Sequence, residues 1–130
     1  MKRNSSYRYP KTVREMVEGQ RHYILNQEKL PSVTTILSAT QSAEKRESLA
    51  KWRERVGEAE ATRIVDSAGA RGTAMHKILE KYVLGEGYLD ETTVGKQAHN
   101  MALQVIQSGL SNITEYYGTE CTLYYPGLYA

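Results

Sequence analysis

The sequence predicts a mixed α/β chain, and two patterns carry this prediction. Apolar residues recur at helical spacing through the middle of the chain, between residues 43 and 108. Strand patterns lie near the ends: residues 21–30 hold a short apolar run followed by a polar turn, and over residues 113–125 β-branched and aromatic residues alternate with polar ones. The chain has 130 residues, no Phe and a net charge of only +2. We therefore expect one globular domain with few core residues.

The first 20 residues show a period of neither 2 nor 3.6, so we expect them to form an arm. The domain then occupies residues 21–130. Residues 21–30 predict a strand, a polar turn and a short return strand. After them, Ser32 is placed to cap a short helix from Val33 to Ala39.

Helical patterns fill the middle of the chain. Ala43 to Val56 predicts a helix that stops at Gly57. A second runs from Glu58 to about Ala68, and the Gly69–Gly72 segment either interrupts it or lets another element approach closely. Helix then resumes at residues 73–84, and a last one covers residues 92–108, with Gly109 as its end.

Strand patterns return at the C-terminal end, over residues 113–117 and 120–125. Pro126-Gly127 predicts a turn, and residues 128–130 resemble the start of a strand without a partner. We expect these to be the first strands of a sheet that is incomplete within this sequence.

Composition and charge limit the classes of function. No apolar run approaches the ~20 residues of a membrane span, and the N-terminus lacks the apolar stretch of a signal peptide. The single cysteine, Cys121, fits a reducing compartment, so we expect a cytoplasmic protein. Residues 1–21 carry six basic and two acidic side chains, whereas residues 64–130 carry four and seven. This asymmetry fits an enzyme that acts on phosphate backbones, and equally a solvated basic tail.

The sharpest local feature is the spacing of Gly72, His76 and Glu80. On a helix these residues follow one another at i, i+4 and share one stripe, where the glycine clears space beside an imidazole and a carboxylate. The stripe predicts either a metal or ligand site or an ordinary surface histidine paired with a carboxylate.

Two other segments offer weaker candidates. Hydroxyls at the start of a helix can bind a phosphate, although capping is an equally good role for Ser32, Thr34 and Thr35. Trp52 between Lys51 and Arg53 can stack on a base, but a tryptophan on an apolar helix stripe is more often part of the core.

Four motifs occur in an order that resembles one family. They are Leu30-Pro31-Ser32-Val33-Thr34-Thr35-Ile36-Leu37, then Lys51-Trp52-Arg53, then Ala70-Arg71-Gly72-Thr73 with His76 and Glu80, and then Glu120 ahead of Leu123-Tyr124-Tyr125. Together they resemble the N-terminal part of phage-type exonucleases of the PD-(D/E)XK superfamily, close to RecB-like nucleases and the mitochondrial genome maintenance exonuclease. The resemblance covers roughly residues 21–130 and implies a restriction-endonuclease-like core.

The resemblance also implies roles for individual residues. His76 would bind the catalytic Mg²⁺ or Mn²⁺, Glu80 would line the site, and Glu120 would be an acidic catalytic residue on the first core strand. The implied contacts to nucleic acid are Ser32, Thr34, Thr35, Lys51, Arg53 and Arg71.

The sequence departs from the family pattern at its most important point. Family members continue with Gly-x-x-Asp and then (Asp/Glu)-x-Lys, whereas no Asp or Glu in this chain is followed two residues later by Lys. Hydrolysis needs a metal held by several oxygen ligands. We therefore expect a fragment, a split gene product or a truncated remnant that is inactive alone, with its C-terminal half supplied by a separate chain.

The resemblance thus implies the N-terminal segment of a metal-dependent exonuclease that hydrolyses phosphodiester bonds at single-stranded DNA ends, in viral DNA metabolism or recombination within an infected bacterial host. Two alternatives stay open. One is a non-catalytic single-stranded DNA-binding or regulatory module derived from such a nuclease, and the other is a purely structural helical protein.

Overall fold

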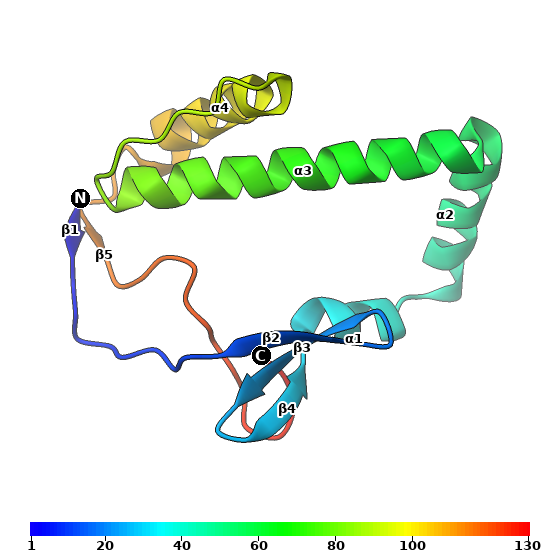
Figure 1. Ribbon diagram of the computed structural model, residues 1–130, viewed down its shortest axis with the longest axis horizontal. Coiled ribbons are helices and arrows are strands. Elements are labelled where there is room, and N and C mark those ends of the chain that lie inside the picture. The colour runs from blue at the N-terminus through cyan, green and yellow to red at the C-terminus, as the bar shows by residue number, and fades with distance from the viewer. The chain divides into compact units, whose positions relative to one another are not determined.

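The computed structural model describes residues 1–130, which form two compact units. The hairpin unit comprises Tyr7–Lys51 and Cys121–Ala130, and the helical unit comprises Met1–Ser6 and Trp52–Glu120. The predicted mixed α/β class is confirmed, since the chain forms helices α1 to α4 and two small sheets (Figure 1). None of the helices combines the length and the apolar character that crossing a membrane requires.

The hairpin unit is built on an antiparallel sheet of three strands, β2 (Val13–Val17), β3 (Gln20–Leu25) and β4 (Glu28–Pro31). The predicted strand, turn and return strand over residues 21–30 are therefore confirmed. Both connections are two-residue turns with positive φ at each residue, Glu18-Gly19 and Asn26-Gln27. Turns of this kind match the right-handed twist of the flanking strands, which explains the tight hairpins.

The prediction that residues 1–20 form an arm is wrong for two segments. All of β2 pairs with β3, from Val13 opposite Ile24 to Val17 opposite Gln20. Lys2–Arg3 forms β1, which pairs in parallel with β5 (Glu115–Tyr116). An edge strand is held by backbone hydrogen bonds, so these segments form strands without a clear alternation of side chains.

The predicted cap and short helix are confirmed. Helix α1 spans Val33–Ala39, and the Ser32 hydroxyl accepts from the Thr35 amide at 3.1 Å. Helix α2 (Ala43–Val56) also has its predicted bounds, although it buries no residue. In the hairpin unit the buried apolar side chains are Leu25 and Leu30.

The C-terminal segment lies on the hairpin sheet but forms no extended strand. Residues 120–125 are irregular, with a single bridge from Tyr125 to Tyr129 across the predicted Pro126-Gly127 turn. The expectation of an unpaired last segment is also wrong. Ala130 donates to the Pro31 carbonyl at 3.1 Å and accepts from the Val33 amide at 3.3 Å.

Helix α3 runs without a break over Glu58–Val83, so the expected interruption at Gly69–Gly72 is absent. Nor does another element approach there, since a Cβ added at Gly69 or Gly72 would meet nothing within 4 Å. A glycine costs a helix interior only about 1 kcal/mol. Favourable residues on both sides and the packing of the C-terminal half offset that cost.

Helix α4 (Thr93–Val105) packs on the C-terminal half of α3. Their contact buries Ile78 of α3 against Ala98 and Ala102 of α4, with Ala74, Met75 and Leu79 around them. Small side chains on one helix let the two backbones approach closely. The α-helix itself ends at Val105, earlier than the expected residue 108, but a π-helical turn, η1 (Ile106–Leu110), continues it through Gly109.

A tight hydrogen-bonded loop precedes α4. The Asp90 carboxylate accepts from the Thr92 amide and hydroxyl at 3.0 and 2.7 Å, and Thr92 in turn caps Gly95. The Asp90 amide donates to Nε2 of His99 at 3.1 Å. The hydrogen bonds from Thr92 lower the pKa of the Asp90 carboxyl. Their stabilising contribution is therefore present at neutral pH and lost as the pH falls through that lowered pKa.

Two glycines in helices should respond in opposite ways to the same substitution. A Cβ at Gly95 would lie 2.2 to 2.4 Å from atoms of Asp90, including its backbone oxygen, so Gly95→Ala must displace the loop. We expect a destabilisation of about 1–3 kcal/mol. Gly69→Ala meets open space and should stabilise by about 0.5–1 kcal/mol. Urea unfolding followed by Trp52 fluorescence measures both, and equal effects would contradict this packing.

Candidate functional site

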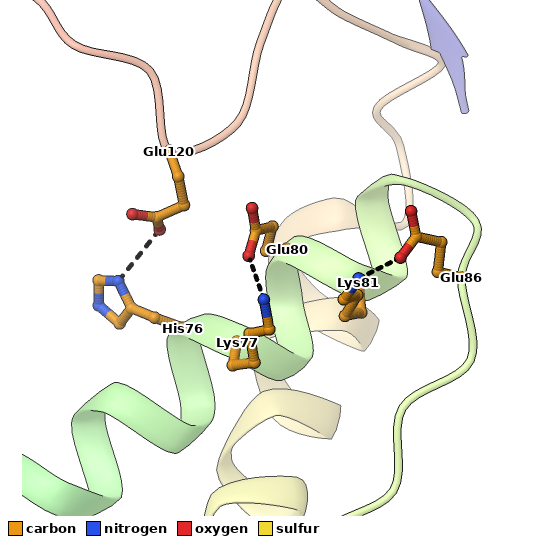
Figure 2. Close-up of polar contacts among 6 residues, drawn as sticks. All are labelled: His76, Lys77, Glu80, Lys81, Glu86 and Glu120. Carbon is orange, nitrogen blue, oxygen red and sulfur yellow. Dashed lines mark hydrogen bonds and ion pairs between the residues drawn. The ribbon is translucent and has the colours of Figure 1, made fainter. Parts of the chain in front are cut away.

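The last turns of α3 carry a row of polar side chains, His76, Lys77, Glu80 and Lys81 (Figure 2). The same turns of α3 pack on α4 through Ile78 and Leu79, and the polar row lies outside that contact. The helical unit thus holds this row on its most firmly packed element.

One contact joins this row to a distant part of the sequence. Nδ1 of His76 lies 3.4 Å from Oε1 of Glu120, and the two side chains are 67% and 57% exposed. The pair is ionic only when the imidazole is protonated, and an exposed pair of this kind contributes about 0–1 kcal/mol. The geometry of the pair, in which two side chains that can ligate a metal converge in solvent, is therefore more informative than its energy.

Glu120 reaches His76 from an irregular segment, so its expected place on a strand is wrong. Its φ is +51°, a left-handed conformation that no strand contains. A residue other than glycine pays roughly 1–2 kcal/mol for this conformation. Strained backbone of this kind is concentrated at functional sites, which makes Glu120 a candidate site residue on structural grounds.

Glu80 does not join the pair. Its carboxylate lies 3.3 Å from Nζ of Lys77, while Lys81 pairs with Glu86, as Figure 2 shows. Gly72, one turn before His76, leaves open space on the helix surface. The predicted stripe is therefore accessible, but its carboxylate, Glu80, is paired with Lys77 and not with His76.

These residues do not by themselves fit a complete Mg²⁺ or Mn²⁺ centre. Such ions take about six ligands, mostly oxygen, in octahedral geometry. Residues 1–130 contain no group of three or more His, Cys, Asp or Glu side chains placed to hold a metal ion. His76 and Glu120 amount to two ligands, and Glu80 is engaged elsewhere.

The hydroxyl cluster at the start of α1 is occupied internally. The Ser32 hydroxyl lies 2.9 Å from the hydroxyls of both Thr34 and Thr35, and Thr35 donates to the Arg21 carbonyl at 2.9 Å. Ser32 is buried. The capping role is therefore confirmed, and these hydroxyls have little capacity left for a phosphate.

The three candidate cations differ in their surroundings. Lys51 pairs with Glu47 at 2.9 Å, and Arg53 pairs with Glu58 at 2.5 Å. Arg71 is half-buried on α3 and lies in none of the ion pairs of the chain. Trp52 is half-buried too, so its exposure does not distinguish a core residue from one that stacks on a base.

Sequence reasoning included a second set of cations in the basic N-terminal stretch but did not place them together on a sheet. Arg14 and Arg21 lie on β2 and β3 and belong to no ion pair. The pairing of β2 with β3 brings Arg14 and Arg21 onto the same sheet, and the sequence pattern did not predict this pairing. The Glu-Gly dipeptide at residues 18–19, a turn signal between two short apolar stretches, was the evidence that could have revealed it.

Comparison of the chain with protein-family models, with curated proteins and with solved structures finds no match.

The contact between His76 and Glu120 can be separated from the strain at Glu120. Glu120→Asn removes the long carboxylate but tolerates positive φ, whereas Glu120→Gln keeps the length and the strain. Both should move the imidazole nitrogen chemical shifts of His76 in NMR spectra, and the Asn variant should be more stable than the Gln variant by about 0.5–1 kcal/mol. Unmoved His76 signals would show that the contact does not form, and His99 is the internal control.

Proposed function

We propose that this chain is the N-terminal segment of a metal-dependent DNA exonuclease and that it supplies part of the metal site. The observation that carries the proposal is the convergence of His76 and Glu120, 3.4 Å apart on an exposed surface. The resemblance in the sequence motifs supports it independently, since both residues belong to those motifs.

The role of this chain in such an enzyme is limited by what its side chains can do. His76 and Glu120 would hold one side of a divalent cation, and Arg71 on the same helix would contact a nearby phosphate. The remaining acidic ligands and the lysine that assists the attacking water would come from residues outside 1–130. We therefore derive no hydrolytic step from this chain alone.

A non-catalytic module that binds single-stranded DNA is the second candidate. It is favoured by the charge of the hairpin unit, in which eight Lys and Arg residues face five Glu residues and no Asp. This surplus lies in the unit without the His76–Glu120 pair. Binding of this kind would need no metal.

Paramagnetic mapping with Mn²⁺ tests the first proposal. At low Mn²⁺, NMR signals of residues around His76 and Glu120 should broaden first, and His76→Ala should abolish this local broadening. Adding a nuclease-resistant phosphorothioate oligonucleotide should raise the Mn²⁺ affinity at least several-fold, because phosphate oxygens provide missing ligands. His22→Gln, which removes a histidine of the hairpin unit, is the matched control.

Three results would contradict the proposal. Broadening centred elsewhere would exclude His76 from metal binding, and so would broadening that survives His76→Ala. Mn²⁺ binding at His76 that the oligonucleotide leaves unchanged would separate the metal from DNA and remove the reason to infer a nuclease.

A further inference from the structure

Two arginines, a methionine and a tyrosine share one face of the hairpin sheet. Arg14 on β2 lies directly opposite Tyr23 on β3, and Met16 lies opposite Arg21. Because side chains two apart in a strand point to the same side, all four lie on one face. We call this set, Arg14, Met16, Arg21 and Tyr23, the arginine face. The two strands that carry it, β2 and β3, are labelled in Figure 1.

The arginine face is open to solvent. Arg14 and Arg21 are exposed, Met16 is 58% exposed, and Tyr23 is half-buried. On the same side of the sheet, Leu30 lies directly opposite Tyr23 and Leu25 follows Tyr23 two residues along β3; both are buried and anchor the sheet to the rest of its unit. The paired strands therefore hold the backbone of these four residues in place, so a ligand would have to order only their side chains.

The charge on this face is uncompensated. Neither arginine belongs to an ion pair, and the stretch of β2 and β3 that forms the face carries no carboxylate on that side. The only acidic side chain on the same side of the sheet, Glu28, lies on β4 opposite Leu25. On the other side, Lys29 pairs with Glu15 at 3.1 Å, so that side is balanced. The arginine face is therefore expected to attract an anionic partner.

The spacing of the four side chains suits a polyanion with exposed rings. Arg14 and Arg21 are diagonal neighbours across the strand pair, about 7–8 Å apart at the backbone. This is comparable to the separation of successive phosphates in an extended single strand. A guanidinium binds a phosphate through two parallel hydrogen bonds, and a tyrosine beside a methionine offers a flat apolar surface for a base.

From these observations we propose that the arginine face binds single-stranded nucleic acid, with phosphates on Arg14 and Arg21 and a base stacked on Tyr23. A single strand is favoured over a duplex because the base must be free to stack. The inference rests on the proposal that the chain acts on nucleic acid. It uses a different unit from the His76–Glu120 pair and involves no metal.

The test is fluorescence anisotropy of a labelled oligothymidine titrated with the full 130-residue chain in EDTA. Affinity should fall with rising salt, with a log–log slope near −0.7 for each phosphate contact. The double variant Arg14→Gln/Arg21→Gln should make that slope less steep by about 1.4, which corresponds to the loss of two contacts. Lys29→Gln, which removes a cation from the opposite side of the same sheet, is the matched control and should leave the slope unchanged.

Stacking has a separate test at Tyr23. Tyr23→Leu should weaken binding at least about fivefold without changing the salt slope, whereas Tyr23→Phe should retain the affinity. NMR shift mapping on the unsubstituted chain gives a readout that needs no variant, and its largest changes should fall within residues 13–25.

The proposal would be overturned by equal slopes in the double variant and in Lys29→Gln, which would indicate only general attraction. Shift changes away from residues 13–25 would overturn it as well. So would concentration-dependent self-association that is lost in Arg14→Gln, since the face would then be a contact between copies of the chain. Because the assay contains EDTA, a positive result here stands even if Mn²⁺ mapping fails at His76, and the reverse also holds.

Discussion

The scarcity of buried apolar surface is the constraint on which the rest of this structure depends. Only six apolar residues are buried, three of them alanines. The accessible surface is 9888 Å², against roughly 8,400 Å² for two separate compact units of these sizes. Large side chains such as Leu37, Leu89 and Leu103 are more than half exposed. Each unit is therefore held by one small apolar contact together with backbone hydrogen bonds.

In the helical unit this constraint decides where a site can be held in place. The contact of Ile78 with Ala98 and Ala102 fixes the C-terminal half of α3, and His76 lies two residues before Ile78. Glu120 follows β5, which pairs with β1 at the N-terminus, and the Asn4 side chain donates to Glu115 at 2.9 Å. The two ends of that unit's sequence are thus paired with each other. The same logic applies to the hairpin sheet, where the buried Leu25 and Leu30 anchor β3 and β4, and Arg14 and Arg21 lie on the same side of the sheet.

Local patterns in the sequence were sufficient for the elements that are stabilised locally. The Ser32 cap, the short helix after it and helix α2 follow from capping and helix propensity, and the structure has them at the predicted bounds. Long-range pairing was not predictable in this way. Strand β2 depends on its partner β3, and the pairing of Lys2–Arg3 with Glu115–Tyr116 leaves no periodic signal in two residues. Glycines at 69 and 72 suggested a break in α3, because propensity alone does not include the packing that offsets them. For the site, helical spacing placed His76 and Glu80 on one stripe. Only the structure showed that the Glu80 carboxylate pairs with Lys77. It also showed that Glu120, whose backbone is left-handed, contacts His76.

The central claim is that residues 1–130 hold part of a metal site and need further ligands to cleave DNA. Its most direct test is digestion of end-labelled single-stranded DNA by the purified chain in Mg²⁺ or Mn²⁺, compared with the His76→Ala variant and resolved by gel electrophoresis. The account predicts no cleavage above the level of the variant. Metal-dependent cleavage that survives repurification and disappears in His76→Ala would contradict it, because residues 1–130 would then contain a complete catalytic centre.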